Sequence, residues 1–517
     1  MTDRASRFFA AFLIALGLLS ASIPRNWFMD DAYITFRYAE NLAQGRGLVF
    51  NPGERVFGLT TPLHALLLGG AVKLGVSAEI ASRAIAGLSL AALILALVSL
   101  SRQVWGDPWP GLLAGCFLLA NPVFLFNGIS GMETHLFLAL WTWAFLMETR
   151  GRMGAALLLA GVCLWCRLEG GVALAVIFLA GLLKAEHRGA WLRWMPGILL
   201  AVSYPVLARL YYGQFLPQSF LTKFGSAYEG LAGSRLILDQ FKMAFLGQNS
   251  YTFFVETPFR VLTPFLLLGL ILLLRAPASK WGPFFAGLAL YALIYIASGK
   301  SLAHHFPWYF VPPLLALDLA AAEGVIFTLG LLRKAVAGLA ESPGSFPTLS
   351  SVCRRRQGLF TRHRAGLLPM AAGLIWMMAL LPALVRTSHN RTFQTDTRIR
   401  YYAVAGQWAK EVLPPGGMLA THEIGALACF SDRPVLDLWG LVSTERLPTA
   451  QAVAKYLPAL VIERNPTSAR DAIEKALPGV YRWYYWRRLW IGVRASLGIT
   501  PALADFDRRY EEMPRWF

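Results

Sequence analysis

Charged residues are scarce in this chain of 517 residues. Asp, Glu, Lys and Arg together make up 15% of it, while 56% is hydrophobic and the mean hydropathy is +0.49. Soluble globular proteins carry about 25% charged residues, so the composition excludes that class. The chain has fewer acidic residues (30) than basic ones (48), which gives a net charge of +18. The basic residues lie between apolar segments, which is typical of membrane topology, and no nucleic-acid partner is expected.

Cysteine is also rare, with five in the whole chain. Three of them (Cys116, Cys163 and Cys166) lie inside apolar segments, where cysteine behaves as a small hydrophobic residue. Cys163 and Cys166 form a Cys-x-x-Cys, but no second pair of that kind follows in the sequence. Neither a zinc site nor a redox motif is indicated.

Long apolar segments dominate the first three quarters of the chain and predict a polytopic α-helical membrane protein. The segment 62–76 is best placed at the membrane interface. A full crossing there would separate most later basic loops from the side of Arg4 and Arg7, against the positive-inside rule. The N-terminus is then cytoplasmic and the C-terminus external. About eleven transmembrane spans are expected, at 7–24, 81–101, 109–126, 132–149, 153–166, 170–184, 191–211, 258–275, 281–298, 306–332 and 366–386.

This topology brings the ionisable groups of several separate loops to one face of the membrane. Charged groups at a membrane edge are costly unless water, cations or substrate meet them there. Their convergence predicts a single site on the external face. The groups are Asp30, Asp31, Glu133, Arg167, Glu169, Lys300, His304 and His305.

The first external loop, residues 25–80, carries two adjacent aspartates. Its pattern predicts an amphipathic helix over 30–44 and a helix that begins at Pro62, both lying along the membrane surface. By position alone, Asp30 and Asp31 fit either of two roles. They are acids favoured at a helix start, or one of them is a catalytic base at the mouth of a membrane-embedded site.

The composition divides the chain into two domains. Residues 1–386 form the membrane domain, with a basic cytoplasmic linker at 335–364. From 387 to 517 the sequence is polar and mixed, with strand patterns at 418–420 and 459–462 and a helical pattern at 398–413. We expect a small external α/β domain there, whose role the pattern does not reveal.

Several motifs together resemble one enzyme family. They are, in order, 30–39 (DDAYITFRYA), 47–56 (GLVFNPGERV), 58–63 (GLTTPL), 131–134 (GMET), 167–170 (RLEG), 211–223 (YYGQFLPQSFLTK), 308–312 (WYFVP) and 437–441 (DLWGL). This set resembles the GT-C glycosyltransferases, in particular the terminal β-(1→2)-arabinofuranosyltransferases of the mycobacterial cell wall and their bacterial relatives. Leu168, Gln218 and Ser219 depart from the family pattern.

The resemblance implies a GT-C fold and an inverting glycosyltransferase. The donor would be a polyprenyl-phosphate sugar, arabinofuranose by the nearest resemblance. The acceptor would be a glycan, a lipopolysaccharide or a glycoprotein on the external face of a bacterial inner membrane. An inverting transfer needs one carboxylate as general base, and Asp30 or Asp31 is the candidate.

The resemblance also suggests roles for other residues, each beside a simpler alternative. Lys223 also fits the role of a lysine at the membrane interface. Arg167 could form an ion pair with Glu133 or Glu169, and Glu133 could cap a helix. A divalent metal held by the histidine pair with an aspartate is left open, and no cofactor is certain. Candidate phosphate-binding residues are Lys223, Arg167, His304 and His305, and candidate sugar or acceptor contacts are Tyr33, Arg37, Glu133, Glu169 and Trp308.

Two other functions remain as alternatives. A transporter or flippase of lipid-linked sugars is one, although transporters favour internal repeats and charged groups near the membrane midplane. A polymerase or ligase that uses a lipid-diphosphate donor is the other. It shares the external polar site, so the sequence distinguishes it poorly from the polyprenyl-phosphate-dependent glycosyltransferase.

Overall fold

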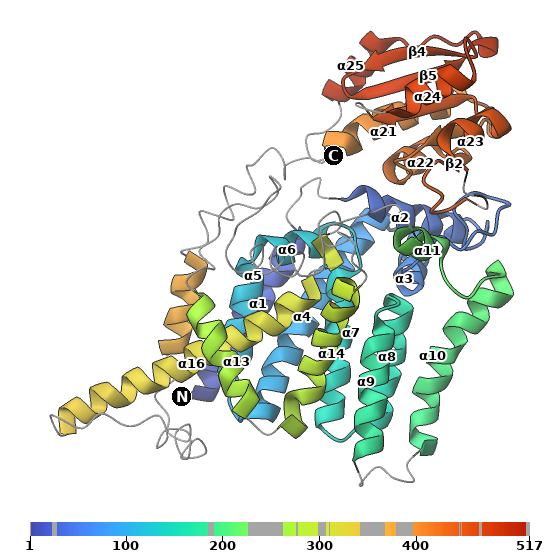
Figure 1. Cartoon of the computed structure of the whole chain (residues 1–517). Coiled ribbons are helices and arrows are strands. Elements are labelled where there is room, and N and C mark those ends of the chain that lie inside the picture. The colour runs from blue at the N-terminus through green and yellow to red at the C-terminus, as the bar shows by residue number, and fades with distance from the viewer. Residues whose placement is uncertain are drawn as a thin grey trace.

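Helices from the first three quarters of the chain stand side by side and carry a smaller α/β unit at one end (Figure 1). The computed structural model describes residues 2–22, 28–184, 191–225, 262–275, 278–297, 307–309, 311–341, 368–378, 397–443, 445, 447–464 and 468–512. Among these residues three helices are long and apolar enough to cross a membrane, and six shorter apolar helices accompany them.

The bundle helices follow the expected apolar segments closely. The helix α8 has the same bounds as its predicted span, and α9 and α10 differ from theirs by one residue. The number of crossings and the cytoplasmic N-terminus stay predictions. The bundle comprises α1 (Thr2–Ser22), α4 (Ala78–Trp105), α5 (Trp109–Ala120), α6 (Pro122–Ile129), α7 (Thr134–Thr149), α8 (Met153–Cys166), α9 (Gly170–Leu183), α10 (Trp191–Tyr212), α13 (Thr263–Arg275), α14 (Ala278–Ala297) and α16 (Val311–Glu341).

Two of the differences from the sequence expectations change a predicted span and the predicted linker. The predicted span 109–126 is two helices, because Pro122 pushes the preceding Asn121 into an extended conformation (ψ 112°) that ends α5. The helix α16 continues to Glu341, so the first residues of the predicted linker 335–364 are helical. The rest of that linker lies outside the described residues.

Three short helices separate the bundle from the α/β unit: α2 (Asp30–Ala43), α3 (Pro62–Lys73) and α11 (Gln218–Gly225) (Figure 1). The amphipathic pattern predicted for α2 is met only in part: Ala32, Phe36 and Ala39 of its apolar stripe are fully buried, but the polar Arg37 and Asn41 are buried as well. Pro62 stands in the first turn of α3, as expected for a residue without an N–H to satisfy. The α/β unit packs on the side of these helices that faces away from the bundle.

The α/β unit, residues 397–512, contains a five-stranded sheet in the order β2-β1-β3-β5-β4. The strand β1 pairs in parallel with β2 and β3, whereas β5 pairs antiparallel with β3 and β4. The sequence predicts β1, β3 and α21 and misses the others. The elements are α21 (Thr397–Val412), β1 (Leu419–Thr421), α22 (Gly425–Ser431), β2 (Val435–Asp437), α23 (Thr449–Tyr456), β3 (Leu460–Arg464), α24 (Ser468–Ala476), β4 (Tyr481–Trp486), β5 (Leu489–Arg494) and α25 (Leu503–Glu512).

The contact between α2 and α22 contains a carboxyl group that resists ionisation. Glu40 accepts a hydrogen bond from the thiol of Cys429 at 3.6 Å. Burial, followed by the nearby charge of Glu79, raises the pKa of Glu40 from 4.5 to about 6. The folded protein therefore holds this proton more tightly than the unfolded chain. The stability that this gives is present below pH 4.5 and is lost as the pH rises to about 6.

We expect Glu40→Gln to raise the free energy of unfolding at pH 7.5 by about 1–2 kcal/mol, because one pKa unit corresponds to about 1.4 kcal/mol. Near pH 4.5 the two proteins should be equally stable, since Glu40 is then protonated. Thermal unfolding in detergent at the two pH values measures the difference. A gain of the same size at both pH values would mean that ionisation of Glu40 is not the cause.

Candidate functional site

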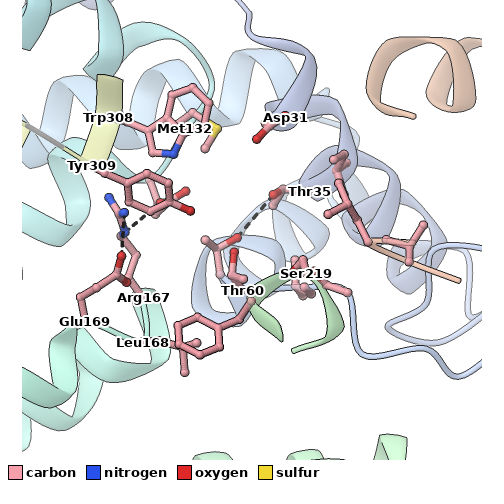
Figure 2. A pocket seen from close by; sticks show the side chains of 18 of the residues that line it. Asp31, Thr35, Thr60, Met132, Arg167, Leu168, Glu169, Ser219, Trp308 and Tyr309 are labelled. Carbon is pink, nitrogen blue, oxygen red and sulfur yellow. Dashed lines mark hydrogen bonds and ion pairs between the residues drawn. The ribbon is translucent and has the colours of Figure 1, made fainter. Parts of the chain in front are cut away.

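A cavity lies where the first external loop, the bundle ends and the α/β unit meet. Figure 2 shows its labelled side chains converging from α2, α11, the turns at 132–133 and 167–169, and the short helix η4 (Pro307–Tyr309). Leu441 and Val442 of the α/β unit complete the lining. The cavity is thus built from segments more than 400 residues apart in sequence.

The turn before α7 fixes the start of α2 beside this cavity. Gly131 has a φ of +87°, and a Cβ there would lie 2.7 Å from the ring of Phe28. The amide of Met29 donates to the carbonyl of Ser130 at 3.0 Å, and Nε2 of His64 lies 3.1 Å from the carbonyl of Gly131. Ser130 and Gly131 therefore hold the start of α2, and with it the two aspartates, next to this turn.

The two adjacent aspartates point to different places. Asp31 is half-buried and points from α2 into the cavity (Figure 2). Asp30 is 7% exposed, and its carboxylate accepts hydrogen bonds from the amides of Gly425 at 3.0 Å and Ala426 at 2.8 Å. Consecutive residues of a helix point about 100° apart. Asp31 can therefore face the cavity while Asp30 binds the backbone of α22.

Arg167 lines the cavity from the turn between α8 and α9, with its guanidinium beside Glu169 and Tyr309 (Figure 2). Its Nη2 lies 3.0 Å from Glu169 Oε1 and its Nε lies 3.5 Å from Glu133 Oε1. The guanidinium also packs between the rings of Phe137 and Tyr309, at 5.1 and 5.0 Å from their centroids. These contacts hold a 3% exposed cation in one orientation at the cavity wall.

Arg167 therefore forms the ion pair that was its simpler predicted role, with both Glu169 and Glu133 as partners. Glu133 occupies the N-cap position of α7 but makes no side-chain capping bond. Glu169 also accepts a hydrogen bond from the hydroxyl of Tyr295. Within the described part of the chain, Nη1 of Arg167 is buried and has no hydrogen-bond partner.

Among the described lining residues, the carboxylates Asp31, Glu133 and Glu169 outnumber the single cation Arg167. The other expected phosphate ligands cannot be placed. Lys223 belongs to α11 but its side chain lies outside the described residues, as do His304 and His305. Within the described ranges no group of three or more His, Cys, Asp and Glu side chains is arranged to hold a metal ion.

The structure does not bring Tyr33 and Arg37 to the cavity, where a sugar contact was expected. The ring of Tyr33 packs against Phe28, Phe36 and Phe430 between α2 and α22. Arg37 donates to carbonyls on both sides of the same interface, those of Phe50 (2.8 Å), Arg433 (2.7 Å) and Ala428. Both side chains fix the α/β unit on the first loop, which explains their burial.

Trp308 does line the cavity, beside Tyr309 in η4 (Figure 2). Sequence reasoning misses most of the small polar side chains of the lining. Thr35 and Thr61 lie 3.4 Å apart at one wall, and the hydroxyl of Ser219 donates to the carbonyl of Gly58 at 2.7 Å. These residues belong to motifs 30–39, 58–63 and 211–223, so the motifs were the available signal. Their members not counted among the expected site residues are Thr35, Thr60, Thr61 and Ser219.

Comparison with known proteins gives three kinds of match. Residues 390–511 match a family model described as a domain of unknown function, DUF8728. The chain is 31% identical over 226 residues to the terminal β-(1→2)-arabinofuranosyltransferase of Mycobacterium tuberculosis. That match covers 39% of this chain and 36% of the relative, so it spans about a third of the relative's length.

Solved structures match over almost the whole chain. ArnT from Cupriavidus metallidurans, in crystals with undecaprenyl phosphate, has a TM-score of 0.59 at 15% identity and covers 96% of this chain and 98% of its own. Apo ArnT gives 0.61 at 17% over the same shares. The apo oligosaccharyltransferase of Archaeoglobus fulgidus gives 0.52 at 12%, covering 95% of this chain and 75% of its own. These likenesses show a shared fold.

Proposed function

We propose that this chain, which has the GT-C fold of those solved enzymes, is an inverting glycosyltransferase. It moves a sugar from a polyprenyl phosphate to a glycan acceptor on the external face of a bacterial inner membrane. Asp31 is the general base and Arg167 binds the donor phosphate. The eleven crossings and the cytoplasmic N-terminus are part of the proposal.

The observation that carries this proposal is the placement of Asp31 and Arg167 in one cavity at the end of the bundle (Figure 2). A base and an anion-binding group facing one cavity are what a transfer from a lipid phosphate requires. The fold adds support, since ArnT was crystallised with undecaprenyl phosphate. The donor sugar rests on the 31% identity to an arabinofuranosyltransferase, and arabinofuranose is the first candidate.

The reaction is a single displacement at the anomeric carbon. The acceptor oxygen forms a bond to that carbon on the face opposite the phosphate, while Asp31 takes the hydroxyl proton. The bond from the anomeric carbon to the phosphate oxygen breaks, and the lipid phosphate leaves with the electron pair. The N–H groups of Arg167 stabilise the charge that grows on the leaving phosphate.

A transporter is the second candidate, and the charge distribution disfavours it. Transport sites lie near the membrane midplane between helix repeats. Here Asp31 stands in a helix outside the bundle, and Arg167 and Glu169 stand in the turn between α8 and α9. Charged groups at the end of the bundle suit a reaction on a headgroup better than passage across the membrane.

The test is sugar transfer by purified protein from a panel of donors. The panel contains polyprenyl-monophosphate and polyprenyl-diphosphate versions of each sugar, beginning with arabinofuranose, and a mixture of oligosaccharide acceptors. Turnover of a monophosphate donor with inversion is the expected result. Turnover of diphosphate donors alone would favour a polymerase or ligase, and donor movement across vesicles without transfer would favour a flippase.

A further inference from the structure

A second group of polar side chains lies at the carboxyl ends of the parallel strands in the α/β unit. The strand β1 is followed along the chain by β2 on one side of it and later by β3 on the other. The gap between the ends of β1 and β3 is therefore the point where the strand order reverses. Ligands of open α/β sheets bind at such a point, and here it carries His422 and Glu463.

His422 is held in a fixed orientation at that point. Its Nδ1 lies 2.8 Å from Glu463 Oε2, and its backbone amide donates to Glu463 Oε1 at 3.0 Å. Its Nε2 lies 3.1 Å from the hydroxyl of Thr449 at the start of α23. The carboxylate is 4% exposed and the imidazole 20% exposed, so the network is anchored inside and reaches the surface at the His422–Thr449 edge.

Trp439 stands beside this edge with 38% of its surface exposed. Its ring is 5.3 Å from the imidazole of His422 at an interplanar angle of 76°. Asp437 fixes the backbone on both sides of it, accepting from the amides of Trp439 at 2.8 Å and Val442 at 2.7 Å. An exposed indole with a fixed backbone, next to hydrogen-bonding groups, is suited to stack on a sugar ring.

The loop that carries Trp439 continues into residues that line the cavity. Leu441 and Val442 line it, and the hydroxyl of Thr222 in α11 donates to the carbonyl of Gly440 at 3.1 Å. Two residues span at most about 7 Å, so the backbone of Trp439 lies within about 7 Å of that of Leu441 at the cavity wall. In Figure 1, β2 and α23 stand directly over α11 and α2, on the side that faces the bundle.

We propose that Trp439, His422 and Thr449 bind the glycan acceptor, at the sugar next to the one that enters the cavity. This inference rests on the proposed function, whose acceptor it specifies as a neutral glycan chain. Charges at the site disfavour an anionic acceptor, because the carboxylates Glu423, Asp437 and Glu463 surround His422, and the described Arg464 is paired with Glu423 at 3.7 Å. The indole stacks on the ring's C–H face, and the Thr449 hydroxyl, which His422 Nε2 holds in place, binds one of its hydroxyl groups.

The experiment measures transfer and binding separately. Neutral arabinofuranosyl oligosaccharides of one to four units are the probes, and a sulfated tetrasaccharide is the anionic comparison. For Trp439→Ala we expect the acceptor KM to rise at least tenfold for two or more units and less than twofold for one unit, with little change in kcat. Trp439→Phe should recover part of the affinity. Tyr485→Ala removes a 44% exposed aromatic ring from β4 and is the matched control.

Binding of the same oligosaccharides to the intact protein, followed by saturation-transfer NMR without donor, separates the two proposals. Binding that Trp439→Ala abolishes, in a protein that transfers no sugar, would keep the subsite and reject the proposed function. Transfer in which Trp439→Ala and the original protein have equal KM values at every length would reject the subsite alone. Preference for the sulfated probe, or an equal KM rise for one unit and for four, would also overturn it.

Discussion

Replacing Asp31 by Asn should lower kcat for sugar transfer by a factor of about 10² to 10⁴, the range that a general base contributes. Asn keeps the size of the side chain but cannot accept the proton of the acceptor hydroxyl. Asp31 is half-buried at the cavity and belongs to the first turn of α2. We therefore expect the thermal unfolding temperature and the donor KM to change little. Initial rates with radiolabelled donor, beside unfolding curves, measure both quantities.

The matched control for the lost charge is Asp471→Asn, in the first turn of α24, where the carboxylate is 80% exposed. It should transfer sugar at the original rate. Asp31→Glu should recover part of the activity, because a carboxylate is restored at a displaced position. If Asp31→Asn retains more than half of the original kcat, Asp31 is not the base and the proposed mechanism fails.

The separation of the two aspartates could not be read from the sequence. Both stand in the first turn of the helix predicted over 30–44, and both lie on the predicted external face. Their roles diverge because α22, almost 400 residues later, supplies the amides that Asp30 binds. Tyr33 and Arg37 were misplaced for the same reason, since the α/β unit that buries them is distant in sequence.

Local signals were sufficient elsewhere, and some were overlooked. The break between α5 and α6 was present in the sequence as Asn121-Pro122. The β4–β5 hairpin gave a weaker signal. Its two-residue turn, Arg487-Arg488, contains a non-glycine residue with a φ of 53° instead of the Asn-Gly that such turns favour. The positions of the apolar helices were well predicted because hydrophobicity is their main determinant.

Replacing Asp30 by Ala should loosen the α/β unit from α2 and destabilise the folded protein by about 2–5 kcal/mol. The substitution leaves two buried amides without their acceptor, and each costs about 1–3 kcal/mol. Sugar transfer should fall too, because Leu441 and Val442 no longer complete the cavity. Faster hydrogen exchange at Gly425 and Ala426 and a lower unfolding temperature would distinguish this variant from Asp31→Asn. Original stability with lost activity would instead assign Asp30 to the chemistry.

Gly425→Ala tests the same contact from the opposite side without touching a carboxylate. A Cβ at Gly425 would lie 1.9 Å from the backbone carbonyl oxygen of Asp30, so α22 must move away from α2. Once either substitution has separated the two helices, the other has little left to break. The double variant should therefore be about as unstable as the worse single one, with a coupling energy of about 1–3 kcal/mol. Additive losses would mean that the two residues stabilise different contacts, and the carboxylate of Asp30 would then need another explanation.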